Sequence, residues 1–379
     1  MKIEQRIWMR KSGWAPSTSG PVGQRAQLVF VFGAKQVLKD EMLFQEIKEV
    51  YPVANIFGCS TAGEICGVRV LDNSIVTTAV EFEHTKLYGR QIRLDEMDKS
   101  YQVGRNLAES IPKEGLVHLF VLSDGLNVNG SALVEGLTSH LPGHVAITGG
   151  LAGDGSNFED TLVFWNSVPQ KDTIAVLGLY GDRLKVGYGS LGGWDPFGTD
   201  RLITRSSGNV LYEMDGRSAL DLYKRYLGEY AQGLPATGLF FPLSIRTKES
   251  DTRVVRTIMS VNEKEQSLTF AGDVPEGAYA RLMKANFDRL IDGATGAARN
   301  SLKDAHAVSP ELAILISCFG RKMVLKQRVE EEVEGVREVL GPGTVLTGFY
   351  SYGEICPFAS GEKSELHNQT MTVTTFREE

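Results

Sequence analysis

The sequence predicts a mixed α/β fold with repeated βαβ-like units, additional strand-rich meanders and two modules. Short apolar segments alternate with helical patterns at three separate places in the chain. At each place the second apolar segment leads into a turn of small residues that contains Gly followed by an acid. The segments between these units alternate apolar and polar residues, which is typical of antiparallel strands. A strand, a crossover helix and a second strand bring two strands into parallel pairing, so we expect βαβ units.

The first unit is predicted to begin at residue 28. Its opening segment is a continuous apolar run, as expected for a strand buried on both faces. Apolar residues at helical spacing come next, and Pro52 ends that helix because proline cannot continue the hydrogen-bond pattern. The expected elements are, in order, a strand at 28–32, a helix containing Phe44, Ile47 and Tyr51, a strand at 53–57 and a turn at 58–66.

The second and third units repeat this order. The second has a strand at 116–122, a helix at 131–140, a strand at 145–148 and a turn at 149–155. The third has a strand at 312–317, a helix, a strand at 344–347 and a turn at 348–356. Its helix is predicted from the helical spacing of Leu325, Val329, Val333, Val336 and Leu340. Further strands are expected at 75–82, 173–180, 183–188, 253–261 and 366–376, and a helix at 218–227.

The chain is expected to divide into an arm and two modules. Gly, Pro and polar residues are scattered through residues 1–25, so we expect an N-terminal arm there. The Gly-rich segment that starts at residue 228 marks a predicted boundary between an N-terminal module at 26–227 and a C-terminal module at 228–379. At 379 residues the chain is long enough for two or three domains.

Composition narrows the class of protein. Apolar residues make up 42% and charged residues 23% of the chain, which is typical of a globular protein rather than a disordered one. The net charge of -7 argues against a nucleic-acid partner, because such a partner requires a basic surface. No apolar run approaches the length of a membrane span, and no signal-peptide core follows Met1. We therefore expect a cytoplasmic protein, without membrane insertion, whose four cysteines are free thiols.

Common nucleotide and metal motifs are missing or lack their structural context. Residues 187–192 fit G-x-G-x-x-G, but Gly, Trp, Asp and Pro follow, and no helix begins there to bind a pyrophosphate. The sequence contains no G-x-x-x-x-G-K-[ST], H-E-x-x-H or C-x-x-C run. These observations disfavour dinucleotide, P-loop and zinc chemistry.

The three turns are the candidates for a ligand site, because open α/β sheets bind ligands at the carboxyl ends of their parallel strands. Two interpretations stay open for Glu64 and Glu354. Each carboxylate either accepts hydrogen bonds within its own turn or accepts them from a bound ligand. The small residues beside them would let a ligand approach the backbone. The predicted ligand-binding residues are Gly58, Cys59, Ser60, Thr61, Gly63, Glu64, Gly150, Gly153, Asp154, Tyr350, Tyr352 and Glu354.

An enzyme acting on a small polar substrate is an alternative. It would use Ser60 or Cys59 as nucleophile and Glu64 or Glu354 as acid and base. The turn that contains Ser60 resembles a nucleophile elbow only in its small residues, and Ala62 replaces the second glycine. No His or Asp pair is placed to activate the nucleophile, so we expect a protein that is not an enzyme.

The turns also resemble a known family. Gly-Cys-Ser-Thr-Ala-Gly-Glu-Ile at 58–65 resembles the signature of the N-terminal FIST module. Gly-Phe-Tyr-Ser-Tyr-Gly-Glu-Ile at 348–355, with Glu-Leu-His-Asn-Gln-Thr at 365–370, is similar to the C-terminal FIST signature. Together the two resemblances cover roughly residues 28–376, in the order in which the family has them.

The resemblance implies a sensory module for signal transduction that binds small ligands, with amino acids as one ligand class. It spans almost all of the sequence, so we expect the signal to pass by direct contact to a separate partner such as a histidine kinase. The layout also resembles stand-alone FIST proteins of the NosP type, which are held to bind haem and to sense nitric oxide. Any haem here would be non-covalent, with His84 or His367 as the axial ligand.

Overall fold

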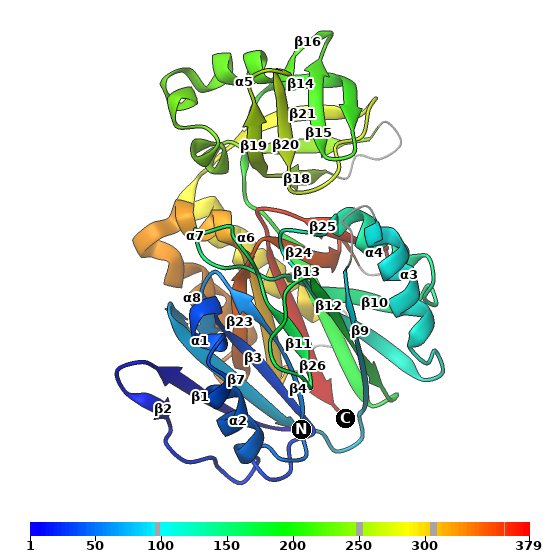
Figure 1. The fold of residues 1–379 in the computed structure, drawn as a ribbon, viewed down its shortest axis with the longest axis vertical. Coiled ribbons are helices and arrows are strands. Elements are labelled where there is room, and N and C mark those ends of the chain that lie inside the picture. The colour runs from blue at the N-terminus through cyan, green and yellow to red at the C-terminus, as the bar shows by residue number, and fades with distance from the viewer. Residues whose placement is uncertain (95–98, 248–252, 304–308, 360) are drawn as a thin grey trace.

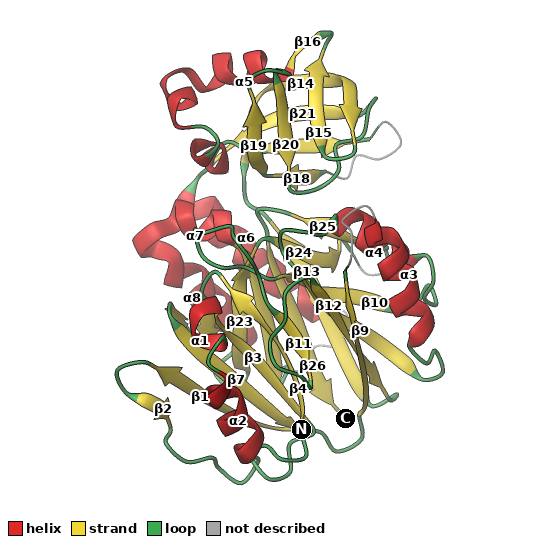
Figure 2. Cartoon of the chain, in the orientation of Figure 1, coloured by secondary structure: helices red, strands yellow, loops and turns green. Residues whose placement is uncertain are grey.

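The computed structural model describes residues 1–94, 99–247, 253–303, 309–359 and 361–379. In these residues the strands form three sheets of six strands and one sheet of eight. The three six-stranded sheets build a large body from residues 1–191 and 287–379, and the fourth sheet builds a small unit from residues 195–284 (Figure 1). Helices and strands alternate through the body, so the predicted α/β class is confirmed (Figure 2).

The first unit of the body shows how the sequence produces each βαβ element. Helix α2 begins where the side chain of Asp40 accepts a hydrogen bond from the backbone N–H of Met42, and it ends before Pro52. Its apolar face packs on β3, which is buried along its whole length. The elements are β1 (Lys2–Met9), β2 (Gly13–Ala15), β3 (Leu28–Ala34), α1 (Lys35–Leu38), α2 (Glu41–Val50), β4 (Asn55–Thr61), β5 (Glu64–Cys66), β6 (Arg69–Leu71) and β7 (Ser74–Glu81).

The second and third units follow the same plan. The second contains β8 (Lys86–Arg93), α3 (Ser100–Ser110), β9 (Leu116–Ser123), α4 (Gly130–Thr138), β10 (Ala146–Leu151), β11 (Val163–Trp165) and β12 (Thr173–Tyr180). The third contains β13 (Leu184–Leu191), α6 (Phe287–Lys303), β22 (Leu312–Cys318), α7 (Phe319–Leu325), η4 (Lys326–Arg328), α8 (Val329–Leu340), β23 (Val345–Ser351), β24 (Gly353–Pro357), β25 (Ser364–His367) and β26 (Met371–Glu378). In every unit the two strands of the βαβ element are parallel, and an antiparallel strand lies beside the first of them.

The three sheets exchange strands in a cycle. After the turn that follows β4, the chain leaves its own sheet and β5 pairs with β23 of the third unit. After the turn that follows β23, β24 pairs with β10 of the second unit. After β10, β11 pairs with β4 of the first unit, which closes the cycle. The carboxyl ends of the parallel strands of all three units therefore meet at one end of the body.

The inner faces of the three sheets share one apolar core. Phe30 of β3 packs edge-on against Phe120 of β9, with ring centroids 5.8 Å apart. Phe32 of the same strand packs against Phe349 of β23 at 4.8 Å. Helices cover the outer faces, so the strands nearest the centre are buried on both sides, as their continuous apolar runs predict.

The small unit is inserted into the third unit of the body, between β13 and α6. It is a strongly curved antiparallel sheet with one main helix, and it lies over the end of the body where the turns meet (Figure 1). Its elements are β14 (Asp195–Ser207), β15 (Val210–Met214), β16 (Arg217–Ser218), α5 (Ala219–Leu227), η2 (Gly228–Gly233), η3 (Ala236–Phe240), β17 (Leu243–Arg246), β18 (Val254–Arg256), β19 (Ile258–Asn262), β20 (Ser267–Phe270) and β21 (Tyr279–Lys284).

Several expected segments differ from the structure. The strand expected at 366–376 is divided into β25 and β26, and the helix expected to run from Leu325 to Leu340 is divided into α7, η4 and α8. Much of the expected loose N-terminal arm is ordered, because β1 pairs with β7 over all eight of its residues. The polar side chains of β1 do not follow the pattern of a buried strand, so the sequence did not predict it. Arg6 is buried, and its guanidinium donates hydrogen bonds to the carbonyls of Pro16 and Ser17. The strand expected at 253–261 is broken into β18 and β19. The division of the chain into modules at residue 228 stays a prediction.

Candidate functional site

The three Gly-rich turns form a closed ring, which we call the turn ring (residues 58–64, 149–155 and 348–354). An equivalent backbone hydrogen bond joins each neighbouring pair of turns. The N–H of Ala62 donates to the carbonyl of Tyr350 at 2.8 Å, and the N–H of Tyr352 donates to Leu151 at 3.2 Å. The N–H of Gly153 donates to Ser60 at 3.0 Å and closes the ring. In each bond the donor lies four residues after the first glycine of its turn, and the acceptor lies two residues after the first glycine of the neighbouring turn. The three units are therefore structurally equivalent here.

Glu64 and Glu354 occupy equivalent places at the ends of the first and third turns of this ring. The carboxylate of Glu64 accepts hydrogen bonds from the hydroxyl of Thr61 and from both the N–H and the hydroxyl of Ser74. The carboxylate of Glu354 accepts equivalent hydrogen bonds from the hydroxyl of Ser351 and from both the N–H and the hydroxyl of Thr370. Both side chains are 1% exposed or less. Their hydrogen bonds are therefore made inside their own units, as the first of the two sequence interpretations predicts.

Burial changes the acidity of these two groups. Desolvation raises the pKa of Glu64 to about 7, against the lowering effect of its bonds to Ser74 and Thr61. Desolvation likewise raises the pKa of Glu354 to about 8. Both carboxyl groups are thus partly protonated near neutral pH.

Asp154 is not the third member of this set, although Gly-Asp in the sequence imitates Gly-Glu. Strand pairing places Glu64 opposite Phe349 and Glu354 opposite Gly150. At the matching position of the second unit Val163 lies opposite Cys59. The second unit inserts a longer loop, 152–162, before that strand, and Asp154 belongs to the loop.

Asp154 instead joins one residue from each of the other two units. Its carboxylate accepts hydrogen bonds from Lys35 Nζ at 2.9 Å and from the hydroxyl of Tyr352. Burial favours its neutral form, but the bonds from Tyr352 and Lys35 hold the pKa of Asp154 below its ordinary value. All three side chains are buried. This cluster therefore joins one side chain from each of the three units.

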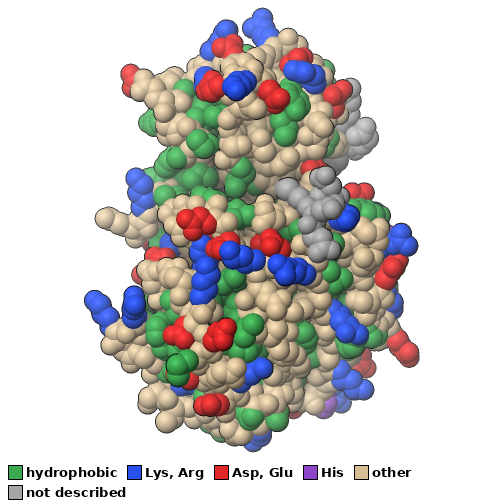
Figure 3. All heavy atoms as spheres, in the orientation of Figure 1, with side chains coloured by type: hydrophobic (Ala, Val, Ile, Leu, Met, Phe, Trp, Pro, Cys, Tyr) green, Lys and Arg blue, Asp and Glu red, His purple; other side chains and the backbone are tan. Residues whose placement is uncertain are grey.

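The carboxylates of Asp154, Glu159 and Asp160 lie within 4.8 Å of one another, as a metal site would require. The ammonium of Lys35 lies among them, 2.6 Å from Asp160 and 3.3 Å from Glu159. Charged side chains gather on this face of the body below the small unit (Figure 3). Lys39 and Lys171 also pair with Asp160, so three ammonium groups already accompany these three carboxylates and the cluster forms an ion-pair network.

The predicted nucleophiles lie within the first turn of the turn ring. Cys59 and Ser60 are fully buried. The hydroxyl oxygen of Ser60 accepts a hydrogen bond from the N–H of Leu162 at 2.9 Å, and burial raises the pKa of Cys59 well above its usual range. A buried thiol with a raised pKa is a poor nucleophile. The geometry therefore offers little support for the enzyme alternative.

The two histidines proposed for haem lie far apart in the fold. His84 is exposed, and its ring nitrogen contacts the guanidinium of Arg183 at 2.9 Å. His367 is buried in β25, where Nε2 contacts the carbonyl of Cys356 at 2.8 Å. Burial lowers the pKa of His367 to about 4, so it is neutral at physiological pH.

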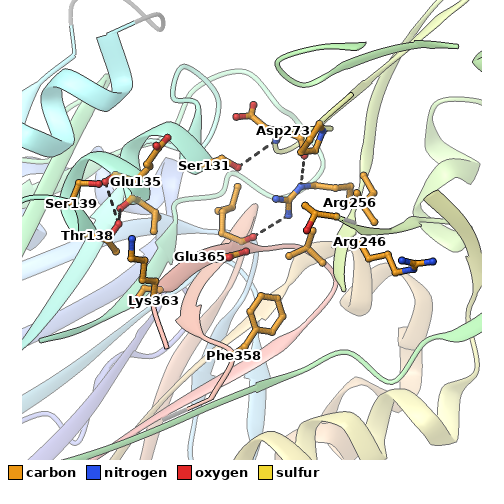
Figure 4. A pocket seen from close by; sticks show the side chains of 17 residues that line it. Ser131, Glu135, Thr138, Ser139, Arg246, Arg256, Asp273, Phe358, Lys363 and Glu365 are labelled. Atoms are coloured by element: carbon orange, nitrogen blue, oxygen red, sulfur yellow. Dashed lines mark hydrogen bonds between the residues drawn. The ribbon is translucent and has the colours of Figure 1, made fainter. Parts of the chain in front are cut away.

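A cavity of about 390 Å³ lies between the body and the small unit. Helix α4 and strand β25 line it from the body, and β17 and β18 line it from the small unit. Arg256, Lys363 and Glu365 lie around its centre, with the ring of Phe358 below them (Figure 4). This size suits a small metabolite.

Arg256 is held firmly at this cavity. Its guanidinium donates to the carbonyl of Leu366 in the body and to the carbonyl of Asp273 in its own unit, both at 3.0 Å. Burial lowers the pKa of Arg256 to about 10, which leaves it charged at neutral pH. Glu365 carries the opposite charge nearby, and burial raises the pKa of that carboxyl. The cavity thus presents fixed charges of both signs.

A second cavity of about 180 Å³ connects the small unit to the turn ring. Leu151 and Tyr352 line it from the ring, and residues 269–272 line it from the small unit. Asn129 borders this cavity, and its amide donates to the side chain of Asp273, which borders the larger one, at 2.9 Å. This hydrogen bond therefore links the linings of the two cavities.

Sequence reasoning located the turn ring but missed the larger cavity. Of the predicted ligand residues, Tyr352 lines a described cavity, whereas Ser60, Thr61, Glu64 and Glu354 lie within the ring as buried, internally bonded groups. The cavity residues come from segments far apart in the chain and follow no motif. Only the second half of the C-terminal signature, residues 365–370, could have indicated this cavity from the sequence. It includes Glu365 and Leu366, which line the cavity at the junction with the small unit.

Comparison with known proteins places the chain in a family. The FIST N domain matches residues 27–217 and the FIST C domain matches residues 219–357, so the protein belongs to the FIST family. FIST domains are associated with small-ligand sensing and signal transduction.

A relative and a solved structure are also similar to this chain. An uncharacterized protein of Methanocaldococcus jannaschii is 25% identical over 339 residues, which is 83% of this chain and 64% of the relative. The chain thus spans less than two thirds of that relative. A cyanuric acid hydrolase from A. caulinodans aligns over 99% of this chain and 98% of its own, with a TM-score of 0.33 and 9% identity. In the described residues no helix is both long and apolar enough to cross a membrane.

Proposed function

We propose that this protein is a non-enzymatic cytoplasmic sensor that binds a small zwitterionic ligand, of the amino-acid class, between the small unit and the body. The cavity of about 390 Å³ at this junction is the observation that supports the proposal most strongly. The signal passes to a separate partner, such as a histidine kinase, through the altered position of the small unit.

The charges around the cavity match such a ligand. A carboxylate would accept hydrogen bonds from the guanidinium of Arg256 and the ammonium of Lys363, and an ammonium would donate to Glu365. The apolar wall, which includes Phe358 and Leu366, would accommodate a side chain. Because the bonds of Arg256 already fix its position, little side-chain entropy is lost when a ligand binds there.

Binding at this place would change the arrangement of the molecule. The ligand contacts residues of both units, so it stabilises whichever relative position gives the best contacts. The turn ring serves as the rigid platform below. Tyr352 lines the smaller cavity and donates a hydrogen bond to Asp154, so a change in that cavity would be transmitted to the Asp154–Lys35 cluster. A partner that binds only one position of the small unit would then bind according to whether the ligand is present.

Calorimetric titration with individual amino acids tests this proposal. Glu365→Gln and Lys363→Gln should each weaken binding at least tenfold, because each removes one half of the charge recognition. Glu362→Gln is the matched control, since this exposed carboxylate lies in the same segment without lining the cavity. Absence of binding by any amino acid, or equal losses in all three variants, would refute the site.

Haem sensing, with nitric oxide as the signal, is the second candidate. His367 packs against Phe358, a residue of the cavity wall, with ring centroids 4.4 Å apart. However, Nε2 of His367 is bonded to Cys356, and Phe358 lies between this ring and the cavity. The residues present therefore do not fit an axial ligand at this cavity. A Soret band in protein supplied with haem, lost in His367→Ala, would reverse this conclusion.

The enzyme alternative rests on the raised pKa values of Glu64 and Glu354, because such shifts are frequent at active sites. In this molecule both carboxyl groups are buried and bonded to their own unit. Desolvation is the main cause of both raised pKa values, and we give this alternative the lowest rank.

A further inference from the structure

We propose that the small unit moves as a lid on the body, held closed by Arg256 and opposed by polar groups that closure buries without partners. The ligand in the junction then decides between the two positions. The link to a ligand rests on the proposed function, whereas the motion itself can be tested without one.

The two chain connections between body and small unit lie side by side. The chain enters the small unit at Asp195 and leaves it at Lys284, and these two residues are paired in the register of β14 and β21. Asn286 then donates from its side chain to Asp195 at 3.0 Å. A unit attached through two adjacent strands can rotate about that attachment.

The body holds the base of this attachment rigidly. The buried guanidinium of Arg321 donates to the carbonyl of Gly192, just before the small unit, and to Leu290, just after it, at 2.7 Å. Gly193 has φ +86°, and a Cβ there would lie 1.9 Å from the carbonyl oxygen of Arg289. The two connections therefore form a fixed hinge base, and motion is expected beyond it.

Arg256 acts as the latch at the junction. It is 5% exposed and reaches from the small unit to the carbonyl of Leu366 in the body. A second bond across the junction, from Asn129 to Asp273, lies next to it, because the carbonyl of Asp273 accepts from Arg256 Nε. These bonds favour the closed position.

Buried polar groups beside the latch oppose closure. Asn368 is fully buried, and neither atom of its side-chain amide has a hydrogen-bond partner among the described residues. The next residue, Gln369, reaches the carbonyl of Leu239 in the small unit only at 3.4 Å, and its Oε1 also lacks a described partner. Leu366, two positions before Asn368, and Gln369, the residue after it, thus both contact the small unit.

Such groups cost free energy where they are buried and regain it in water. Opening the lid would hydrate Asn368 and Gln369, whereas closing it makes the bonds of Arg256. The two contributions have opposite sign, so ligand contacts that span the junction can shift the balance between the two positions.

Hydrogen exchange on the ligand-free full-length protein tests the inference. Asn368→Leu keeps the approximate volume and removes both unpartnered atoms, so it should raise the melting temperature. It should also slow amide exchange about five-fold or more in the junction segments 253–259 and 364–370. Gln369→Met should act in the same direction and serves as the second variant where Asn368→Leu does not fold.

Asn129→Leu is the matched control, because both ends of that amide are bonded, to Ala132 and Asp273. It should lower the melting temperature and speed exchange at the junction. If Asn368→Leu and Gln369→Met destabilise the protein as Asn129→Leu does, the inference is overturned. A higher melting temperature without slower exchange at the junction overturns it as well. Neither outcome bears on amino-acid binding, which the titration measures separately.

Discussion

Glu64 and Glu354, at opposite ends of the chain, accept the same set of hydrogen bonds. Each takes a hydroxyl bond from the residue three positions before it, Thr61 or Ser351. Each also takes an N–H and a hydroxyl from one residue at the start of the antiparallel strand. The repeated sequence Gly-Glu-Ile-Cys therefore encodes a repeated anchor, which fixes a turn to its own sheet before the chain crosses to the next.

The protonation of these anchors predicts how stability depends on pH. Burial raises both pKa values, to about 7 for Glu64 and about 8 for Glu354, so the folded state holds protons that the unfolded state releases near pH 4.5. Their contribution to stability is present below about pH 4.5 and is lost as pH rises toward 8. At about 1.4 kcal/mol per pKa unit, we expect each carboxyl to account for a loss on the order of 3–5 kcal/mol across this range.

Thermal unfolding at pH 5.5 and pH 8.5 measures this dependence. Glu64→Gln and Glu354→Gln imitate the protonated acid, because the amide nitrogen can donate to the hydroxyl of Thr61 or Ser351. Each variant should show a smaller decrease in melting temperature with pH than the natural protein. An unchanged pH dependence in both would show that these carboxyl groups are ionised in the folded state.

The buried ion pair of Arg321 and Glu332 predicts a large loss on removing one partner. Both side chains are fully buried, with Nη2 and Oε2 2.7 Å apart. Arg321→Met leaves Glu332 as an uncompensated charge, so we expect a loss of about 3–5 kcal/mol in the free energy of unfolding. Urea denaturation measures it. Arg328→Met, which breaks only exposed pairs, should cost less than about 1 kcal/mol.

The latch residue predicts a change in the junction rather than in the core. Arg256→Gln shortens the side chain and removes its bond to Leu366, so exchange in segments 253–259 and 364–370 should become several-fold faster. Exchange in the strands of the body, such as β9, should stay unchanged. Equal acceleration in β9 would mean that Arg256 supports the whole fold instead of the closed position of the small unit.

The turn ring predicts that two glycines with unusual backbone angles differ in their tolerance of alanine. A Cβ on Gly149 (φ +149°) would lie 1.9 Å from the carbonyl oxygen of Val121, whereas a Cβ on Gly155 (φ +74°) meets nothing within 4 Å. Gly149→Ala should therefore cost several kcal/mol or prevent folding, and Gly155→Ala about 1 kcal/mol. Similar melting temperatures for the two variants would contradict the close packing of the ring.

Local patterns in the sequence predicted the elements of the three units, because a buried strand and an amphipathic helix each leave a periodic signal within a few residues. Helix α2 and strand β12 lie where these patterns place them. Strand β1 gave no such signal, since its buried Arg6 is satisfied by carbonyls that only the folded chain supplies. The Gly-Asp sequence at Asp154 gave a misleading signal, because it resembles the Gly-Glu of the other two turns. In the sheet, the position equivalent to Glu64 and Glu354 is occupied by Val163.

The sequence by itself determined the α/β class, the repeated turns and membership of the FIST family, since all three rest on local spacing and on motifs. The tertiary structure alone decided that strands are exchanged between three sheets, that the turns close into a ring and that a small unit covers them. It also brought Arg256 and Glu365 to one cavity. Such contacts join residues far apart in the chain, where no short pattern records the pairing and only burial and charge in the folded molecule select it.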